Sequence, residues 1–148
     1  MAIHEYPAKV TWNGGKEGSG SVTAEGSGTS VPLAVPTEFG GTGGASNPEE
    51  LLTSAIASCY SMTFGIIAAN RKLPVASLAV SAVGEVDQQG AALTFKKVTI
   101  RPTIVLDSSA TEEQRKLALD MAHKADSYCI VTNAVRGKVE VTVEPTIS

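Results

Sequence analysis

The stretch Leu51–Asn70, LLTSAIASCYSMTFGIIAAN, decides how this chain folds, because its twenty residues include no Asp, Glu, Lys, Arg or His. Directly before it, Asn47-Pro48-Glu49-Glu50 reads as an N-cap, a proline at the first helical position and two acids at the positive end of a helix dipole. The pattern predicts a helix about 30 Å long. Since this helix has no strongly polar face to give to water, we expect it to be buried nearly all round.

An uncharged helix of this length can lie in a membrane or in a protein interior. Polar residues such as Thr53 and Asn70 interrupt it, which disfavours insertion into a bilayer, so we expect no membrane partner. A chain of 148 residues has little interior in which to enclose a whole helix. Small side chains such as Ala55, Ala57 and Ser58 let a second helix approach closely. We therefore expect a homodimer with this helix in its core.

The composition describes an ordinary globular protein. The length predicts a single domain, residues 1–148. Hydrophobic residues make up 43% of the chain and charged residues 18%, which is too apolar for a disordered protein. The net charge is −3 and neither sign forms a run, so we expect no nucleic-acid partner. Residues Met1–Trp12 carry charges where a signal peptide needs an apolar core, and we therefore expect a cytoplasmic protein.

Short runs rich in β-forming residues flank the long helix on both sides. The expected strands are Tyr6–Trp12, Ser19–Glu25, Val31–Val35, Val75–Val86, Leu93–Leu106 and Lys138–Val143. Asn13-Gly14-Gly15 predicts a turn that joins the first two strands into a hairpin. Pro32 confines the third strand to a sheet edge, because proline cannot donate to a ladder. Residues 87–90 join the next two strands into a long hairpin.

Two further helices are expected after this second hairpin. Thr111 and Gln114 have the spacing of a capping box, which opens an amphipathic helix that runs to about Ala125. A short helical turn follows near Cys129–Val135. The strands and helices alternate too irregularly for a parallel βαβ sheet, so the predicted fold class is α+β.

The two cysteines are the candidate reactive groups. Cys59 lies on the long helix, and its neighbours one turn away, Ala55, Ile56, Met62 and Thr63, form a wall that by itself would raise a thiol pKa. A small buried core residue is therefore an open alternative for Cys59. Cys129 precedes a short helix, whose N-terminal amides can lower a thiol pKa; a buried junction residue is the alternative there. A disulfide between them would close a loop of 70 residues, which is normal for a reversible pair.

Metal and nucleotide chemistry find little support. The soft ligands are His4, His123, Cys59 and Cys129, and no two of them have the short spacing of a zinc site. The glycine-rich residues 40–45 lack the Gly-Lys-Ser/Thr ending of a P-loop and the third glycine of a dinucleotide fingerprint. We therefore expect neither a metal nor a cofactor.

Three motifs along the chain resemble those of the OsmC/Ohr family, the osmotically inducible and organic hydroperoxide resistance proteins. They read NPEELL at 47–52, ASCYSM at 57–62 and CIVTNA at 129–134, in the family's order. The Cys-Tyr-Ser-Met form is more similar to the OsmC branch. The resemblance spans nearly the whole chain and implies antiparallel sheets around a long buried helix, in an intertwined homodimer.

The resemblance also implies site residues. Cys59 matches the peroxidatic cysteine, Cys129 the resolving cysteine, and Glu49 the glutamate that orients a catalytic arginine. Glu49 lies ten residues before Cys59, roughly 15 Å along an unbroken helix, so contact needs a break, a long intermediary or the partner subunit. Taken alone, Glu49 reads as an ordinary first-turn acid.

The chain departs from the family in its cations and in the last motif. The family's arginine comes from the N-terminal part, whereas the first arginine here is Arg71. Lys16 is our first choice as its replacement; Arg71, which we expect to reach back only across a subunit boundary, is one of the later arginines that compete with it. Ile130 replaces the family proline and Thr132 replaces its serine.

Two functions follow from the resemblance. The first is an enzyme, a cysteine-based peroxidase that reduces organic hydroperoxides and is recycled by an external dithiol, in defence against oxidative or osmotic stress. The second is an OsmC-like dimer that binds a small apolar ligand with little or no turnover. The missing N-terminal arginine separates the two.

Overall fold

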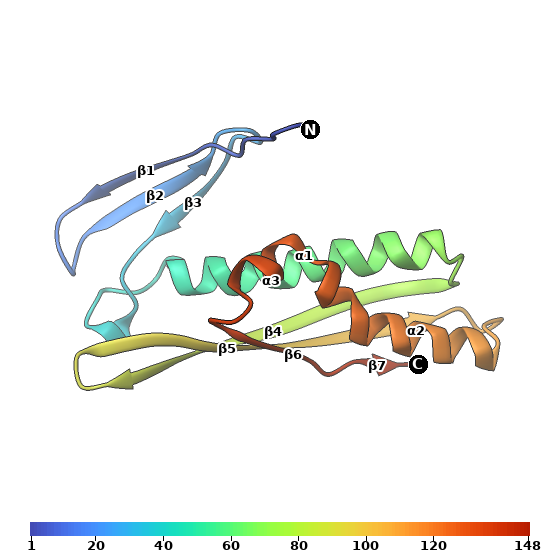
Figure 1. Ribbon diagram of the computed structural model, residues 1–148. Coiled ribbons are helices and arrows are strands. Elements are labelled where there is room, and N and C mark those ends of the chain that lie inside the picture. The colour runs from blue at the N-terminus through green and yellow to red at the C-terminus, as the bar shows by residue number, and fades with distance from the viewer. The chain divides into compact units, whose positions relative to one another are not determined.

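Residues 1–51 form the first of two units in the computed structural model, which describes all 148 residues, and residues 52–148 form the second. The first unit is an antiparallel sheet in the order β1 (Ala8–Asn13), β2 (Ser19–Ala24) and β3 (Thr29–Leu33) (Figure 1). The predicted hairpin is confirmed, and the Pro32 strand lies at the sheet edge, because β2 is the one strand that pairs with β3; beyond it, Ser46 forms only an isolated bridge with Leu33. Gly14 takes a φ of 95° in the hairpin turn, which favours glycine.

The long helix α1 (Pro48–Asn70) begins and ends as local chemistry dictates. The Glu50 amide donates to Asn47 Oδ1 at 2.9 Å, so the predicted N-cap is confirmed. At the other end the Leu73 amide donates to the Ala68 carbonyl at 2.9 Å, while Lys72 takes the left-handed φ of 54°. This is the usual way for a helix to satisfy its last carbonyls, although glycine more often holds the left-handed position.

The second unit contains a mixed four-stranded sheet. The long hairpin of β4 (Val75–Gln89) and β5 (Ala92–Leu106) is antiparallel, as predicted. Two short strands, β6 (Glu140–Val143) and β7 (Thr146–Ile147), both pair with β5 in parallel. The sequence did not predict these parallel pairs or β7. They form because the helical segment between β5 and β6 provides the long crossover that parallel neighbours require.

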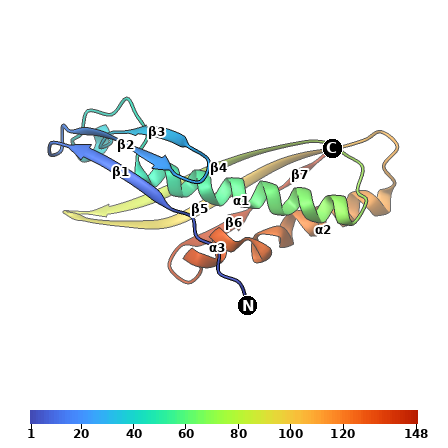
Figure 2. The ribbon, with the colours of Figure 1, turned by 90° about the horizontal axis from the view of Figure 1, so that it is seen from above.

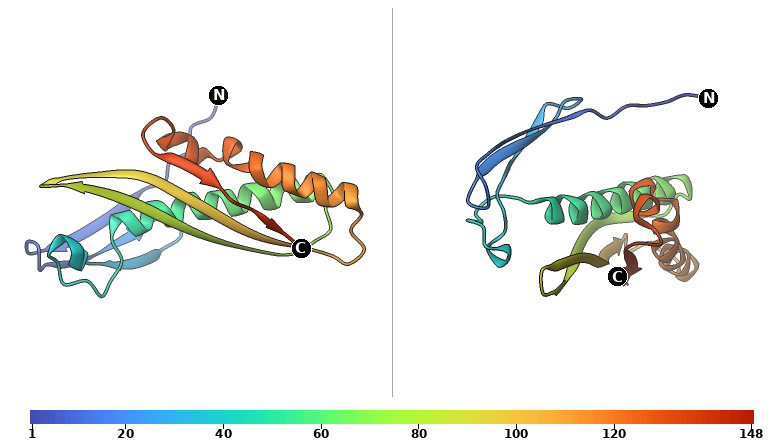
Figure 3. Two further views of the ribbon diagram at one scale, coloured as in Figure 1. Left: turned by 90° about the horizontal axis from the view of Figure 1, so that it is seen from below. Right: turned by 60° about the vertical axis from the view of Figure 1, so that its left-hand side comes forward.

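That crossover contains α2 (Glu112–Lys124), a 3-10 turn η2 (Ala125–Tyr128) and α3 (Ile130–Val135). The predicted capping box is confirmed: the Gln114 amide donates to Thr111 Oγ1 at 3.1 Å, and the Thr111 amide donates to Gln114 Oε1 at 2.9 Å. Figures 2 and 3 show this segment beside α1. The hydrophobic core joins α1, β5 and α2.

One face of α1 supplies the core of the second unit. Ile56, Tyr60, Phe64 and Ala68 recur every fourth residue and are buried. The Tyr60 hydroxyl donates to the Ala122 carbonyl at 2.6 Å, which ties α1 to α2. Burial and the nearby Asp126 charge raise the pKa of Tyr60, so the phenol stays protonated and keeps donating.

The opposite face of α1 is exposed in the single chain, so one chain alone does not bury this helix all round. From Ser54 to the end of α1 the exposed positions carry no charge: Ser54, Ala55, Ser58, Met62, Gly65, Ile66, Ala69 and Asn70. By length and composition alone α1 could cross a membrane. The packing of its other face into a core shared with β5 and α2 is that of a core helix in a two-layer domain.

Candidate functional site

Cys59 opens into a hollow of about 480 Å³ within the second unit. One stripe of α1 and the residue just after it form one wall, and α2, η2 and α3 contribute the other. The lining residues are Cys59, Thr63, Ile66, Ile67, Asn70, Arg71, Met121, Tyr128 and Ile130. Those from α1 recur at intervals of three or four residues, so they share a face of the helix.

The two cysteines meet at this hollow as free thiols. Cys59 is half-buried, whereas Cys129 is fully buried. Cys129 is the N-cap of α3, and the Thr132 amide donates to its sulfur at 3.4 Å. The Cys129 thiol also interacts with the Cys59 sulfur. The structure therefore brings together residues 70 positions apart in the sequence.

The surroundings of Cys59 favour its thiolate. Burial raises the pKa of this thiol, but hydrogen-bonding groups around the sulfur outweigh burial and hold the pKa below its usual value. These groups are the Cys129 thiol, the backbone amides of Val131 and Ile130, and the Thr63 hydroxyl. No cationic side chain is among them. Donors from α3 thus supply stabilisation that we expected from a lysine or arginine.

The surroundings of Cys129 have the opposite effect. Burial raises its pKa, and the interaction with Cys59 raises it further, while Thr132 lowers it by less. The Thr132 amide of α3 lowers the pKa of Cys129, as expected of a helix N-terminus, but burial and Cys59 outweigh it. The reason is geometric, since the first amides of α3, those of Ile130 and Val131, act on Cys59, and Thr132 alone lowers the pKa of Cys129 against full burial.

The wall predicted around Cys59 is also different from the observed one. Ile56 belongs to the core, and Met62 is 69% exposed and lies outside the hollow. Thr63 is the one predicted neighbour that lines it. The apolar lining comes instead from Ile66 and Ile67, which lie about two turns after Cys59 on α1, and from Met121 and Ile130 in the segment after β5. The difference arises because the part of α1 that lines the hollow lies C-terminal to Cys59.

Glu49 lies in the first turn of α1 and is half-buried. α1 has no break between Glu49 and Cys59, so the two remain about 15 Å apart along the helix axis. Lys16, the predicted cation, belongs to the first unit, where its side chain lies against Gly40. The roles of Glu49 and Lys16 stay predictions.

Sequence reasoning missed two polar residues of the hollow. Thr63 was counted as part of an apolar wall, although its position four residues after Cys59 places its hydroxyl beside the sulfur. Arg71 was expected to reach the site only from another subunit, whereas it lines the same hollow as Cys59 within one chain. Arg71 follows the last residue of α1, twelve positions after Cys59, so helix periodicity alone does not place it on the face of Cys59.

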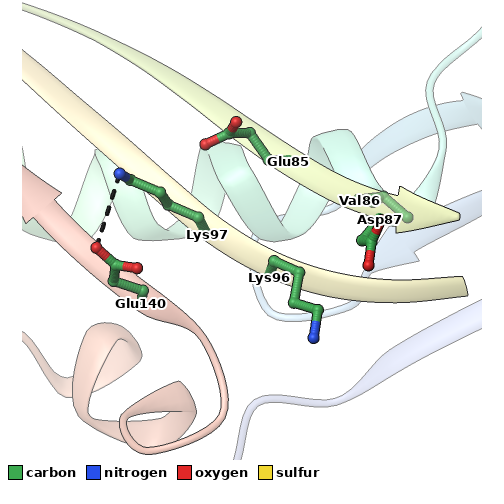
Figure 4. Close-up of a pocket in the computed structure, with 6 residues that line it drawn as sticks. All are labelled: Glu85, Val86, Asp87, Lys96, Lys97 and Glu140. Carbon is green, nitrogen blue, oxygen red and sulfur yellow. Dashed lines mark ion pairs between the residues drawn. The ribbon is translucent and has the colours of Figure 1, made fainter.

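A second hollow, of about 410 Å³, differs in chemistry. It lies on the sheet and is lined by Glu85, Val86, Asp87, Lys96, Lys97 and Glu140 (Figure 4). Lys97 and Glu140 approach to 3.7 Å there, as an exposed ion pair on neighbouring strands. Mixed exposed charges are typical of a solvated sheet face, and no nucleophile or apolar wall is present.

No three His, Cys, Asp or Glu side chains in the chain lie together in a way that could hold a metal ion.

Known proteins resemble this chain over nearly its whole length. The OsmC-like protein family matches residues 41–144. YmaD, an uncharacterized protein of Bacillus subtilis, is 31% identical over 147 residues, which cover 99% of this chain and 97% of that protein. An organic hydroperoxide resistance protein-like protein of Staphylococcus aureus is 29% identical over 145 residues, 95% of this chain and 94% of that one. An OsmC-like protein of unknown function from Vibrio cholerae superposes with a TM-score of 0.78 at 22% identity, over 96% of this chain and 100% of that chain.

Proposed function

Because this chain belongs to the OsmC-like protein family, we propose that it is a cysteine-based peroxidase that reduces organic hydroperoxides in stress defence. The observation that carries the proposal is the thiol pair. Cys59 has a lowered pKa and opens into an apolar hollow, while Cys129, with a raised pKa, is buried against it. This difference in pKa suits a nucleophile and a resolving thiol, because only the thiolate attacks a peroxide and the thiol with the lower pKa is the one that is ionised.

The reaction follows from these two environments. The Cys59 thiolate attacks the outer oxygen of the hydroperoxide, the O–O bond breaks, and the alkoxide takes a proton from water to leave as an alcohol. Cys59 then carries a sulfenic acid. The Cys129 sulfur attacks the Cys59 sulfur, the S–O bond breaks, and water leaves as the disulfide forms. An external dithiol reduces this disulfide and is itself oxidised to a disulfide.

The lining of the hollow favours an organic hydroperoxide over hydrogen peroxide. Ile66, Ile67 and Met121 give it apolar walls, which an alkyl group can cover at a gain of free energy and hydrogen peroxide cannot. The Thr63 hydroxyl and the α3 amides stabilise negative charge at the reacting sulfur.

A peroxidase assay tests the function. With dithiothreitol as the dithiol, the wild-type protein should consume tert-butyl hydroperoxide with a higher kcat/KM than hydrogen peroxide. Cys59→Ser should abolish consumption of both. Wild-type protein that leaves both peroxides unconsumed would reject the enzyme.

We also propose that the exposed face of α1 is covered by a second copy of the chain. That face presents Ala55, Ser58 and Met62 without a charge, and small residues let helices approach closely. A long helix face without charged side chains, such as this face of α1, is unusual on the surface of a monomer. Light scattering at micromolar concentration should give two subunit masses, and one subunit mass would exclude the homodimer.

Glu49 has a positioning role in this proposal, in line with the family resemblance. Since α1 is unbroken, Glu49 acts through a long intermediary such as a lysine, or from the partner subunit, and not by direct contact with Cys59 of its own helix. Glu49→Gln should slow peroxide reduction and leave the disulfide-forming step unchanged. We expect the protein to act in the cytoplasm, where a reducing environment returns both thiols after each cycle.

The hollow itself favours a second candidate, a dimer that binds a small apolar ligand with little turnover. A volume of about 480 Å³ with mostly apolar walls is of ligand-binding size. The two functions separate at Cys59: in a binding protein Cys59→Ser leaves ligand affinity and biological effect intact, whereas in the peroxidase it removes the activity.

A further inference from the structure

The Cys59 hollow contains one cationic side chain. Of its nine lining residues, Arg71 alone is a cation, and neither Asp nor Glu is among them. Two other arginines of this unit have carboxylate partners: Arg101 pairs with Glu144 at 2.8 Å and Arg136 with Asp126 at 3.6 Å. Arg71 has no ion pair of this kind. A cation in an otherwise uncharged hollow provides a site for an anion that comes with the ligand.

Arg71 and Cys59 mark the two ends of the α1 stripe that lines the hollow. They are twelve positions apart, which corresponds to roughly 18 Å along the helix axis. Ile66 and Ile67 lie between them on α1, and Met121 faces this stretch from α2. A ligand that reaches both ends therefore passes over apolar side chains and meets a positive charge at the far end.

These distances set the length of such a ligand. An extended chain advances about 1.1 to 1.2 Å per bond, as the reach of a polypeptide shows, so roughly 18 Å corresponds to about 15 to 16 bonds. The side chains of Arg71 and Cys59 take up part of this distance, so a shorter ligand chain can reach both. The geometry fits an unbranched amphiphile with its reactive group near one end and an anionic group near the other.

A simpler role for Arg71 is to balance the negative end of the α1 dipole. Lys72, the next residue, lies at the same helix end and can supply that charge, yet it does not line the hollow. The dipole also gives no reason for an uncharged path between Arg71 and Cys59. The two roles make different predictions: balancing the helix dipole affects only the stability of the protein, whereas binding an anion affects the affinity of the hollow for its ligand.

We propose that Arg71 determines substrate specificity by binding the anionic end group of a long-chain hydroperoxide, whose peroxide then lies at Cys59. This inference rests on the proposed peroxidase function for its reactive end only. The guanidinium forms two parallel hydrogen bonds with a carboxylate, which fixes the register of the chain in the hollow. Hydroperoxides without an anionic group use the apolar wall alone.

Protection of Cys59 from alkylation tests the binding step without any turnover. Iodoacetamide modifies Cys59, and tetradecanoate or tetradecanol, kept below the concentration at which they aggregate, competes for the hollow. In the wild type, half-protection should need at least fivefold less tetradecanoate than tetradecanol. Arg71→Gln should bring this ratio close to one, and Arg71→Lys should keep part of it. Arg101→Gln, which removes an arginine outside the hollow, should match the wild type.

Turnover provides the second arm. For a long-chain hydroperoxy acid and its methyl ester, Arg71→Gln should lower kcat/KM for the acid at least fivefold more than for the ester or for tert-butyl hydroperoxide. Equal loss for all three substrates, or equal protection by acid and alcohol in the wild type, would overturn the role of Arg71. A wild type that consumes no hydroperoxide rejects the peroxidase instead, and the protection ratio then still decides whether Arg71 binds anions.

Discussion

The middle of α1 and the junction between η2 and α3 each hold one cysteine, and they treat the same side chain in opposite ways. Cys59 is half-buried, faces the hollow and has a lowered pKa; Cys129 is fully buried and has a raised pKa. The difference arises because the Ile130 and Val131 amides act on Cys59 and not on the N-cap residue of their own helix. The pKa of each thiol therefore depends on which hydrogen-bond donors reach its sulfur, and the position of the cysteine in the sequence does not reveal this.

Replacing each cysteine with serine in turn should give the largest difference between the two thiols, measured as the rate of peroxide reduction. Cys59→Ser removes the nucleophile, so we expect the peroxidase rate to fall by at least about a thousandfold, as for loss of a covalent nucleophile. Cys129→Ser leaves the nucleophile but no resolving thiol, so one equivalent of peroxide should still be reduced. Mass spectrometry after peroxide treatment should then find oxidised Cys59. Equal losses at the first turnover in both variants would contradict the assigned roles.

Tyr60→Phe tests the tie between the two regions. The Tyr60 hydroxyl donates to the buried Ala122 carbonyl on the segment that leads to Cys129. Without it this carbonyl loses its donor, which should lower the free energy of unfolding by about 1–3 kcal/mol. Chemical denaturation measures the loss, and the rate of Cys59–Cys129 disulfide formation should fall with it. As a control, Tyr6→Phe in the exposed N-terminal segment should have no effect on either quantity.

Thr63→Val sharpens the comparison by removing one donor from Cys59 at nearly constant volume. The Thr63 hydroxyl helps hold the pKa of Cys59 below its usual value, so its loss should raise that pKa and reduce the thiolate fraction at pH 7. The rate of Cys59 alkylation at pH 7 should fall several-fold and recover at higher pH. Thr63→Ser keeps the hydroxyl and should behave like the wild type. If Val and Ser gave the same profile, Thr63 would only fill space.

Lys16→Ala should have the smallest effect. Lys16 is the cation that the sequence predicts beside Cys59, whereas the groups that lower the pKa of Cys59 are thiol, amide and hydroxyl donors. We therefore expect the midpoint of Cys59 alkylation to rise less than in Thr63→Val, with peroxide reduction slowed only slightly. A larger rise than in Thr63→Val would make Lys16 the dominant source of stabilisation.

Much of the fold was predictable because its signals are local. Asn47 and Pro48 define the start of α1, and Thr111 with Gln114 defines the start of α2. The parallel pairing of Lys97 on β5 with Glu140 on β6 was not predictable, because it depends on how the intervening helices pack across the sheet. That one chain leaves part of α1 exposed followed from chain length, but which residues form the exposed face depends on how β5 and α2 pack against the helix.

The pairing of the two cysteines was predictable, whereas the surroundings of each thiol were not. The family resemblance pointed to Cys59 and Cys129, and the structure brings them together. The direction of each pKa shift depends on the docking of α3 against α1, which no spacing in the sequence encodes. Arg71 was misplaced for the same reason, because the hollow is completed by α2 and η2.

The pH dependence of alkylation at the two cysteines tests the central claim most directly. The lowered pKa means that Cys59 gains its thiolate below the ordinary thiol value near 8.5, and loses it as the pH falls through the lowered pKa. The raised pKa of Cys129 delays its thiolate to above that value. Quantitative mass spectrometry after brief iodoacetamide treatment should give a midpoint below about 8.5 for Cys59 and above it for Cys129. Coincident midpoints, or the reverse order, would contradict the account.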